Sequence, residues 1–179
     1  MAVTLDTTVG GASANSTASL AFVTAYFNNR PTVYSAVFVD LVDPDDKRRL
    51  LIAATQRLEE EEDSLAGVRV NLVQALSQPR LSGYRDCGAS YVRTAYNNGS
   101  AIDPVWMEAQ CELANVMAVL RTDPSTANPL AQFKELEVPG VKMVMRDDLP
   151  AFKDGLPDVV LRKLARFRRS YGGLELIRV

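Results

Sequence analysis

An apolar pattern of helical period between residues 103 and 121 constrains the fold more than any other feature of the chain. Asp103 can accept hydrogen bonds from the free amides of a first helical turn, and Pro104 is tolerated there because those amides lack intrahelical partners. The apolar positions that follow at three- and four-residue spacing are Trp106, Ala109, Leu113, Val116, Met117 and Leu120. The pattern predicts a helix to about Arg121 with one face in a core.

Asp43 followed by Pro44 is the same start signal and predicts a second helix over about residues 44–62. Its apolar positions are Leu50, Leu51, Ala54 and Leu58. The acidic run from Glu59 to Asp63 is expected to be a solvated face. It opposes the helix dipole at this end, so the last turn should fray or serve a purpose beyond stability.

Two shorter helices are expected. Ser19 can cap one over residues 20–28, and Pro157 starts a last one over about 157–169, followed by two glycines. Their expected core residues are Leu20, Val23, Phe27, Val160, Leu161, Leu164 and Phe167.

The remaining segments predict a hairpin, a loop and two extended ends. Residues 132–146 alternate apolar and polar positions around a Pro-Gly pair, as in a β-hairpin, and residues 64–101 look like a long loop interrupted by a short apolar segment. Residues 1–18 are rich in Thr, Ser, Gly and Asn and predict a flexible or partner-ordered arm, and 172–179 an extended tail. We therefore expect a mainly α fold: a small helical bundle of about four helices over 19–171, with one β-hairpin, a long loop and extended termini.

Composition agrees with one globular domain. The chain has 179 residues, of which 47% are hydrophobic and 23% charged, as in an ordinary folded protein. It contains no apolar run of membrane-spanning length and no signal-peptide pattern in its first twenty residues, so we expect a soluble protein made in the cytoplasm.

The sequence contains no histidine. The commonest general base, the commonest metal ligand and every Ser-His or Cys-His nucleophile are therefore missing. Cys87 and Cys111 form no CxxC pair and are expected to be free thiols. We expect a protein that is not an enzyme and that uses no metal and no cofactor.

Two groups of residues could bind a partner. Basic and aromatic residues alternate between positions 80 and 96: Arg80, Tyr84, Arg85, Tyr91, Arg93 and Tyr96. This mixture is used by single-stranded nucleic-acid binders, and equally by protein interfaces. Residues 155–179 carry a net charge of +4, and the rest of the chain carries about −6. The basic segment could bind nucleic acid or an acidic protein surface, or it could merely be a solvated helix face.

Several short motifs, in order, resemble tailed-phage head-to-tail connector proteins, whose homologues are often labelled DnaT-like single-stranded DNA-binding proteins. They are the start MAVTLDTTVGGASANS, the triplet Ala25-Tyr26-Phe27, Gln74-Ala75-Leu76 leading to Pro79-Arg80, Ile102-Asp103-Pro104, and the stretch from Ala109 to Ala114. The resemblance covers most of residues 1–145. Where the family usually has an aromatic residue before the Pro-Arg pair, this chain has Gln78.

The resemblance implies a structural adaptor in the virion, at the head-to-tail interface, assembled in the host bacterial cytoplasm. It would form a ring of about twelve copies by heterologous contacts, bind the portal and a tail or tail-completion protein, and let genomic double-stranded DNA pass through its lumen without specific binding. Arg80, Tyr84, Tyr91, Arg93 and Tyr96 would then form the subunit or tail interface. The residues expected to dock on the portal are Arg162, Arg166, Arg169, Leu174, Leu176 and Val179. The alternative is a single-stranded DNA-binding protein of phage replication.

Overall fold

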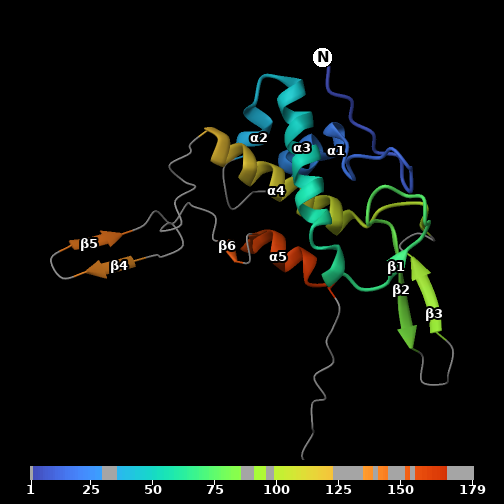
Figure 1. Ribbon diagram of the computed structural model, residues 1–179. Coiled ribbons are helices and arrows are strands. Elements are labelled where there is room, and N and C mark those ends of the chain that lie inside the picture. Colours follow the sequence, from blue (N-terminus) through green and yellow to red (C-terminus); the bar gives the residue numbers. More distant parts are fainter. Residues whose placement is uncertain are drawn as a thin grey trace, which may run out of the picture.

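The computed structural model describes residues 2–29, 36–85, 91–95, 99–122, 135–138, 141–144, 152–153 and 156–168. This part of the chain is mainly helical, as expected (Figure 1). Its helices are α1 (Leu20–Asn29), α2 (Val37–Asp40), α3 (Pro44–Glu59), α4 (Pro104–Thr122) and α5 (Asp158–Leu164), with a 3-10 turn, η1, at Glu62–Ser64. No helix among these residues is long and apolar enough to cross a membrane.

Helix α4 is the centre of the fold, since α1, α2, α3 and α5 all pack against it. It begins where the sequence predicts, with the Asp103 carboxylate accepting a hydrogen bond from the Val105 amide at 2.9 Å. Trp106 and Ala109 are fully buried, Leu113 and Val116 nearly so. Met117 packs against the core from a half-buried position.

Helix α3 confirms the second predicted start, because the Asp43 side chain accepts from the Asp45 amide at 2.8 Å. Leu51, Ala54 and Leu58 are fully buried on its inner face. The helix ends at Glu59, three residues earlier than expected, and the chain tightens into η1. The acids of this end have partners elsewhere in the chain, as described below.

Helix α1 is capped as predicted, with the Ser19 hydroxyl accepting from the Phe22 amide at 3.2 Å. Helix α5 begins at the expected place but ends at Leu164, not near 169. Beyond it the backbone turns toward the segment after η1. There the Ala66 amide donates to the Phe167 carbonyl at 2.7 Å, and Leu65 forms an isolated bridge with Arg168. These bonds replace the last helical turn.

The region expected to be a long loop contains an antiparallel three-stranded sheet, which corrects that prediction. Its strands, in sheet order, are β1 (Val68–Arg69), β2 (Arg80–Arg85) and β3 (Tyr91–Ala95). The sequence does not reveal these strands, because short apolar runs and interspersed polar residues break the alternation typical of a strand. In the structure, pairing between the strands supplies hydrogen-bond partners for backbone groups that a loop would leave unpaired. The predicted hairpin is confirmed as β4 (Glu135–Val138) and β5 (Val141–Val144), and β6 (Phe152–Lys153) pairs with β7 (Leu156–Pro157).

The N-terminal segment differs from the arm that we expected. Asn15 and Asp6 close a loop, with the Asp6 amide donating to the Asn15 side chain at 2.9 Å and the Asn15 amide donating to the Asp6 carbonyl at 3.0 Å. Ser16, Thr17 and Ala18 are buried. This segment is thus ordered by its own chain, through bonds within residues 4–16, a bond from Ala75 to Gly11, and bonds of residues 16–18 to α4.

Gln110 of α4 is the main partner, and its side chain is fully buried. Its amide oxygen accepts from the Ala18 backbone at 2.9 Å and from the Thr17 hydroxyl. Its amide nitrogen donates to the Ser16 hydroxyl at 2.8 Å and to the Leu51 carbonyl at 3.1 Å. One side chain therefore joins the N-terminal segment, α3 and α4.

Replacing Gln110 with leucine should destabilise the protein by about 3 kcal/mol, because several buried polar groups lose their partner at once. Chemical denaturation measures the loss, and hydrogen exchange should show faster exchange at the amides of residues 14–18. The matched control is Gln56→Leu on the exposed side of α3, which should change stability little. Equal losses for both variants would contradict the role assigned to Gln110.

Candidate interaction site at the base of the β2–β3 hairpin

The β2–β3 hairpin brings together part of the predicted basic and aromatic cluster. Its register pairs Arg85 with Tyr91, Tyr84 with Val92 and Gly83 with Arg93. Since alternate positions of a strand lie on opposite faces, Arg85, Tyr91 and Arg93 occupy positions on one face of the ladder and Tyr84 a position on the other. Tyr96 lies outside the described residues.

Arg80, the first residue of β2, serves the base of this hairpin. Its guanidinium donates to the Ala66 carbonyl at 3.0 Å and to the Gly67 carbonyl at 2.7 Å. It also pairs with Glu62 at 3.2 Å, and its side chain is only 9% exposed. Arg80, which we expected at a subunit or tail interface, is thus used within its own chain.

Glu62 joins the hairpin base to the end of α3. Arg69 of β1 forms a bidentate ion pair with Glu62. Its Nε donates to Oε1 at 2.8 Å and its Nη2 donates to Oε2 at 2.5 Å. The hydrogen bond from Arg69, followed by the nearby positive charges, lowers the pKa of Glu62 from its ordinary value. The carboxylate therefore holds β1 and β2 against η1.

The neighbouring acids have partners too. Glu59 accepts from the Ser77 amide at 2.6 Å and from its hydroxyl at 3.0 Å, and burial raises the pKa of Glu59. Glu61 pairs with Arg168 at 3.1 Å. The acidic run is thus a hub that joins α3, the sheet and the turn after α5. The prediction that this run is a solvated face was wrong, because the partners of its carboxylates are distant along the chain.

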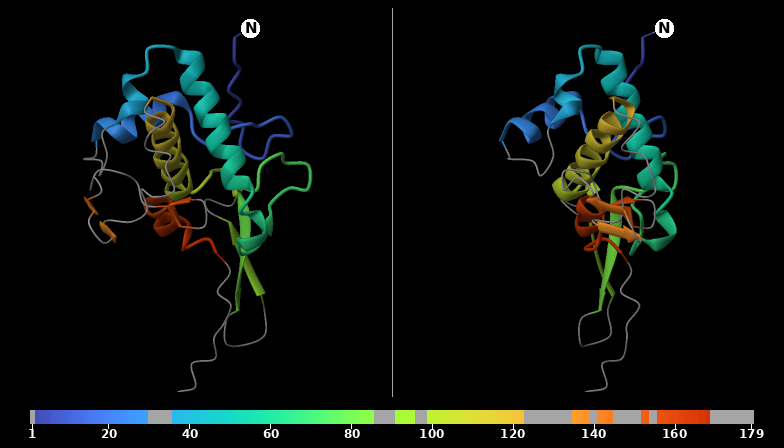
Figure 2. Two further views of the ribbon diagram at one scale, coloured as in Figure 1. Left: turned by 60° about the vertical axis from the view of Figure 1, so that its left-hand side comes forward. Right: turned by 90° about the vertical axis from the view of Figure 1, so that its left-hand side faces the viewer.

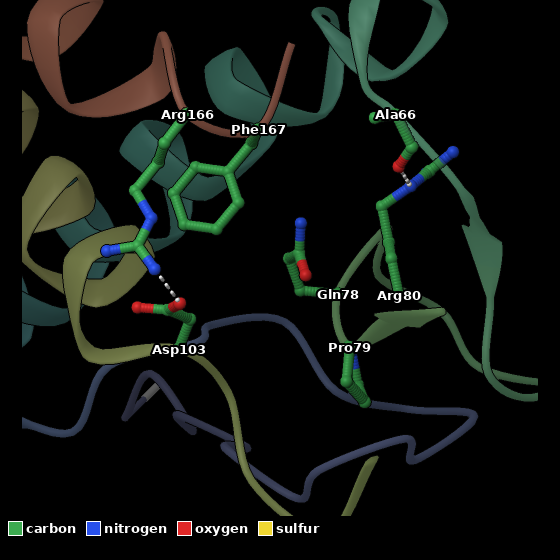
Figure 3. A pocket seen from close by; sticks show the side chains of 7 residues that line it. All are labelled: Ala66, Gln78, Pro79, Arg80, Asp103, Arg166 and Phe167. Atoms are coloured by element: carbon green, nitrogen blue, oxygen red, sulfur yellow. Dashed lines mark hydrogen bonds and ion pairs between the residues drawn. The ribbon is translucent and has the colours of Figure 1, made fainter. Parts of the chain in front are cut away.

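A cavity of about 180 Å³ lies beside this hub (Figure 3). Its described lining is Ala66, Gln78, Pro79, Arg80, Asp103, Arg166 and Phe167. Gln78 lies between Arg80 and Phe167 in Figure 3 and is 6% exposed, yet its amide nitrogen donates to no described protein group. The sequence marks this position as unusual, since Gln78 stands where the connector proteins that the chain resembles usually have an aromatic residue. A group in the cavity that accepts a hydrogen bond would satisfy the Gln78 amide, and a water molecule would do so as well.

The residues predicted to dock on the portal are only partly described. Arg162 pairs with Asp158 in the same helix, and its side chain is 80% exposed. Arg166 pairs with Asp103 at 2.9 Å, at the mouth of the cavity. Arg169, Leu174, Leu176 and Val179 lie outside the described residues.

The basic side chains that the structure describes share one property: each already has a partner in the chain. Lys47 donates to the Val39 carbonyl at 2.7 Å, and Lys163 pairs with Glu108 at 2.6 Å. The arginines that contact a carboxylate are Arg48, Arg49, Arg57, Arg69, Arg80, Arg121, Arg162, Arg166 and Arg168. A phosphate that binds to this part of the surface would compete with those carboxylates.

Cys111 is buried and free, and burial raises the pKa of its thiol, so the thiolate that reacts is disfavoured. Cys87 lies outside the described residues. Among the residues that the structure describes, no group of three or more acidic, Cys or His side chains is placed to hold a metal ion.

Replacing Glu62 with glutamine should lower the free energy of unfolding by about 1 kcal/mol at neutral pH, because the neutral amide pairs less well with Arg69 and Arg80. The folded-state pKa of Glu62 is lowered from 4.5, so its contribution is complete above that value. As the pH falls through the folded-state pKa the carboxylate is protonated, and the difference between the two proteins should disappear.

Urea denaturation from pH 7 to pH 3 measures this difference. Glu60→Gln is the matched control, since the Glu60 side chain is 66% exposed and pairs only with Arg57 among the described contacts. A stability difference for Glu62→Gln that stays constant with pH would contradict the assignment.

A comparison with known families matches most of the chain. A family model described as "Putative DnaT-like ssDNA binding protein" matches residues 1–140, which include α1 to α4, the β2–β3 hairpin and its base. No curated protein and no solved structure matches the chain. The family's description names DNA binding and does not name a connector role. Because the match spans most of the chain, the protein belongs to the family that this model describes.

Proposed function

We propose that the protein is a structural head-to-tail adaptor of a tailed phage. It assembles as a ring beneath the portal and forms part of the channel through which DNA leaves the capsid. The proposal rests on the resemblance to connector proteins given above, and one structural observation carries it. The basic side chains of the described surface are bound to carboxylates or carbonyls of the same chain.

This charge pairing suits a conduit. A protein that grips a nucleic acid replaces counterions with free Lys and Arg side chains, and its affinity grows with the number of phosphates neutralised. This chain has a net charge of −2, and its described cations are already paired. A wall with these properties lets DNA slide past without holding it.

The hairpin supplies a surface for assembly. Strands β2 and β3 extend away from the helical body (Figures 1 and 2), while Glu62 and Arg80 hold their base to the end of α3. An extension anchored in this way loses little conformational freedom when it binds. In the proposal, Tyr84, Tyr91 and Arg93 contact a neighbouring subunit or the tail, and the C-terminal segment meets the portal.

The proposal also sets partners and location. The protein is not an enzyme and uses no cofactor. Its partners are other copies of itself, the portal protein and a tail or tail-completion protein, and its place is the head-to-tail interface of the virion.

Single-stranded DNA binding is the second candidate, and the family's description favours it. The hairpin could carry this activity, because Arg85, Tyr91 and Arg93 occupy positions on one face of the ladder. Aromatic and basic residues on one strand face are a common platform for stacked bases and phosphates. The two candidates differ in whether the hairpin meets protein or DNA.

The double substitution Tyr91→Ala with Arg93→Ala should leave a folded protein that joins portals or tails poorly, because interface anchors are typically Tyr and Arg. Purified protein is mixed with isolated portals or DNA-filled heads, and bound adaptor is counted by electron microscopy and gel. The control is Val42→Ala with Arg49→Ala near the start of α3, which removes one large exposed side chain and one arginine away from the hairpin. Normal attachment and tail joining by the hairpin variant would exclude this surface from assembly, and failure of the unmodified protein to bind portals would overturn the adaptor.

Binding to single-stranded oligonucleotides should be weak, with a Kd above about 10 μM at physiological salt, and without preference for sequence. Fluorescence anisotropy measures it. Tight binding that is lost when Tyr84, Tyr91 and Tyr96 are replaced by alanine would establish the second candidate in place of the adaptor.

A further inference from the structure

We infer that copies of this chain associate head to tail by placing an apolar knob, formed by Leu72 and Val73, in an apolar groove between α1 and α4 of the next copy. The inference rests on the proposed function, because the contact between copies is the one that would build the ring of the adaptor.

The knob contains the most exposed large apolar side chain among the described residues, Leu72. Leu72 is 96% exposed and Val73 66%, and both stand at the tip of the turn between β1 and β2. Single exposed apolar side chains are ordinary, but two adjacent ones on a protruding turn favour an interface.

Hydrogen bonds hold this turn in one shape. The Val73 amide donates to the Asn71 side chain at 3.2 Å, and the Asn71 amide donates to the Gln74 side chain at 2.9 Å. The buried Gln74 amide in turn donates to the carbonyls of Leu76 at 2.7 Å and Pro79 at 3.1 Å. The knob is therefore presented without loop ordering, which removes one of the costs of binding.

The N-terminal segment supports the knob from the side. The Ala75 amide donates to the Gly11 carbonyl at 3.0 Å, in the tight turn where Gly10 has a φ of +68°. Val9, which is 38% exposed, lies in that same turn. A second segment of the chain, which carries one partly exposed apolar side chain, is thus bonded next to the turn.

The groove lies between α1 and the start of α4. Its described lining is Phe22, Ala25, Tyr26, Asn29, Pro104 and Glu108, around a volume of about 260 Å³. A cavity of about 150 Å³ lined by apolar side chains already holds a benzene-sized group, so this groove can admit a leucine side chain. Asn29 and Glu108 are the polar residues of this lining, and apolar contacts usually have polar groups around them.

Knob and groove lie on opposite sides of the molecule. The left view of Figure 2 shows α1 at the left edge and the turn between β1 and β2 at the right edge, with α3 and α4 between them. One copy therefore cannot fill its own groove. A contact between two different patches of identical chains is heterologous, and repeating it closes a ring when the rotation allows.

Cysteine cross-linking tests the contact directly. Leu72→Cys and Ala25→Cys variants are mixed near millimolar concentration, and again on isolated portals, and treated with a short bismaleimide. A covalent dimer should form only in the mixture, and a chain carrying both substitutions should give a ladder. Each variant alone controls for the native thiols Cys87 and Cys111. In the matched control, Val42→Cys is mixed with Ala25→Cys. Val42 is 95% exposed, and this mixture should give no dimer.

Blocking each surface separately tests the head-to-tail arrangement. Leu72→Asp removes the knob and Ala25→Arg fills the groove, and neither variant should assemble alone. Their mixture should stop at dimers, because each copy keeps one working surface. Both residues are exposed, so thermal unfolding should show intact folds.

The inference is overturned if no Leu72–Ala25 cross-link forms in either condition, or if Leu72 cross-links mainly to Leu72, which would indicate a symmetric dimer. Portal binding without the Leu72–Ala25 cross-link would reject this contact and leave the adaptor function in place. The cross-link without portal binding would support the contact and reject the adaptor.

Discussion

The buried amide of Gln110 is the interaction on which most of this structure depends. It lies on α4, the helix that every other helix contacts, and it bonds the N-terminal segment and the Leu51 carbonyl of α3 at the same time. A buried amide is stabilising only when its donors and acceptors are all satisfied. The small polar residues 16–18 meet that need, and this is why a stretch with little apolar content is part of the folded body.

A second polar centre controls the position of the sheet. Glu59 ends α3, and Glu61 and Glu62 follow it; their partners are Ser77, Arg168, Arg69 and Arg80. Carboxylates at the C-terminal end of a helix oppose its dipole, which is a local cost. That cost is offset by ion pairs and hydrogen bonds that join three distant parts of the chain.

These two centres leave separate surfaces for function. Since the described cations serve internal pairs, the proposed adaptor would use shape and apolar contact more than positive charge on this part of its surface. The knob at Leu72 and the groove beside α1 have this character, and the projecting hairpin is a third separate surface. Three distinct patches on one chain suit a ring subunit, which must meet two neighbours and further partners.

The sequence by itself determined where α1, α3, α4 and α5 begin, while the short helix α2 was not predicted. Asp43-Pro44 and Asp103-Pro104 specify helix starts because a cap needs only residues of the same turn, and the 3.6-residue period identified Leu51, Leu58 and Trp106 as core. The 135–144 hairpin followed equally from local alternation and a Pro-Gly pair.

Tertiary structure alone decided the partners of Arg80 and Glu62, the burial of residues 16–18, the β2–β3 pairing and the cavity at Gln78. The β2–β3 pairing is local, but its strands carry no clear alternation of apolar and polar residues. The others depend on contacts between residues far apart in the chain, and no local pattern encodes such a contact.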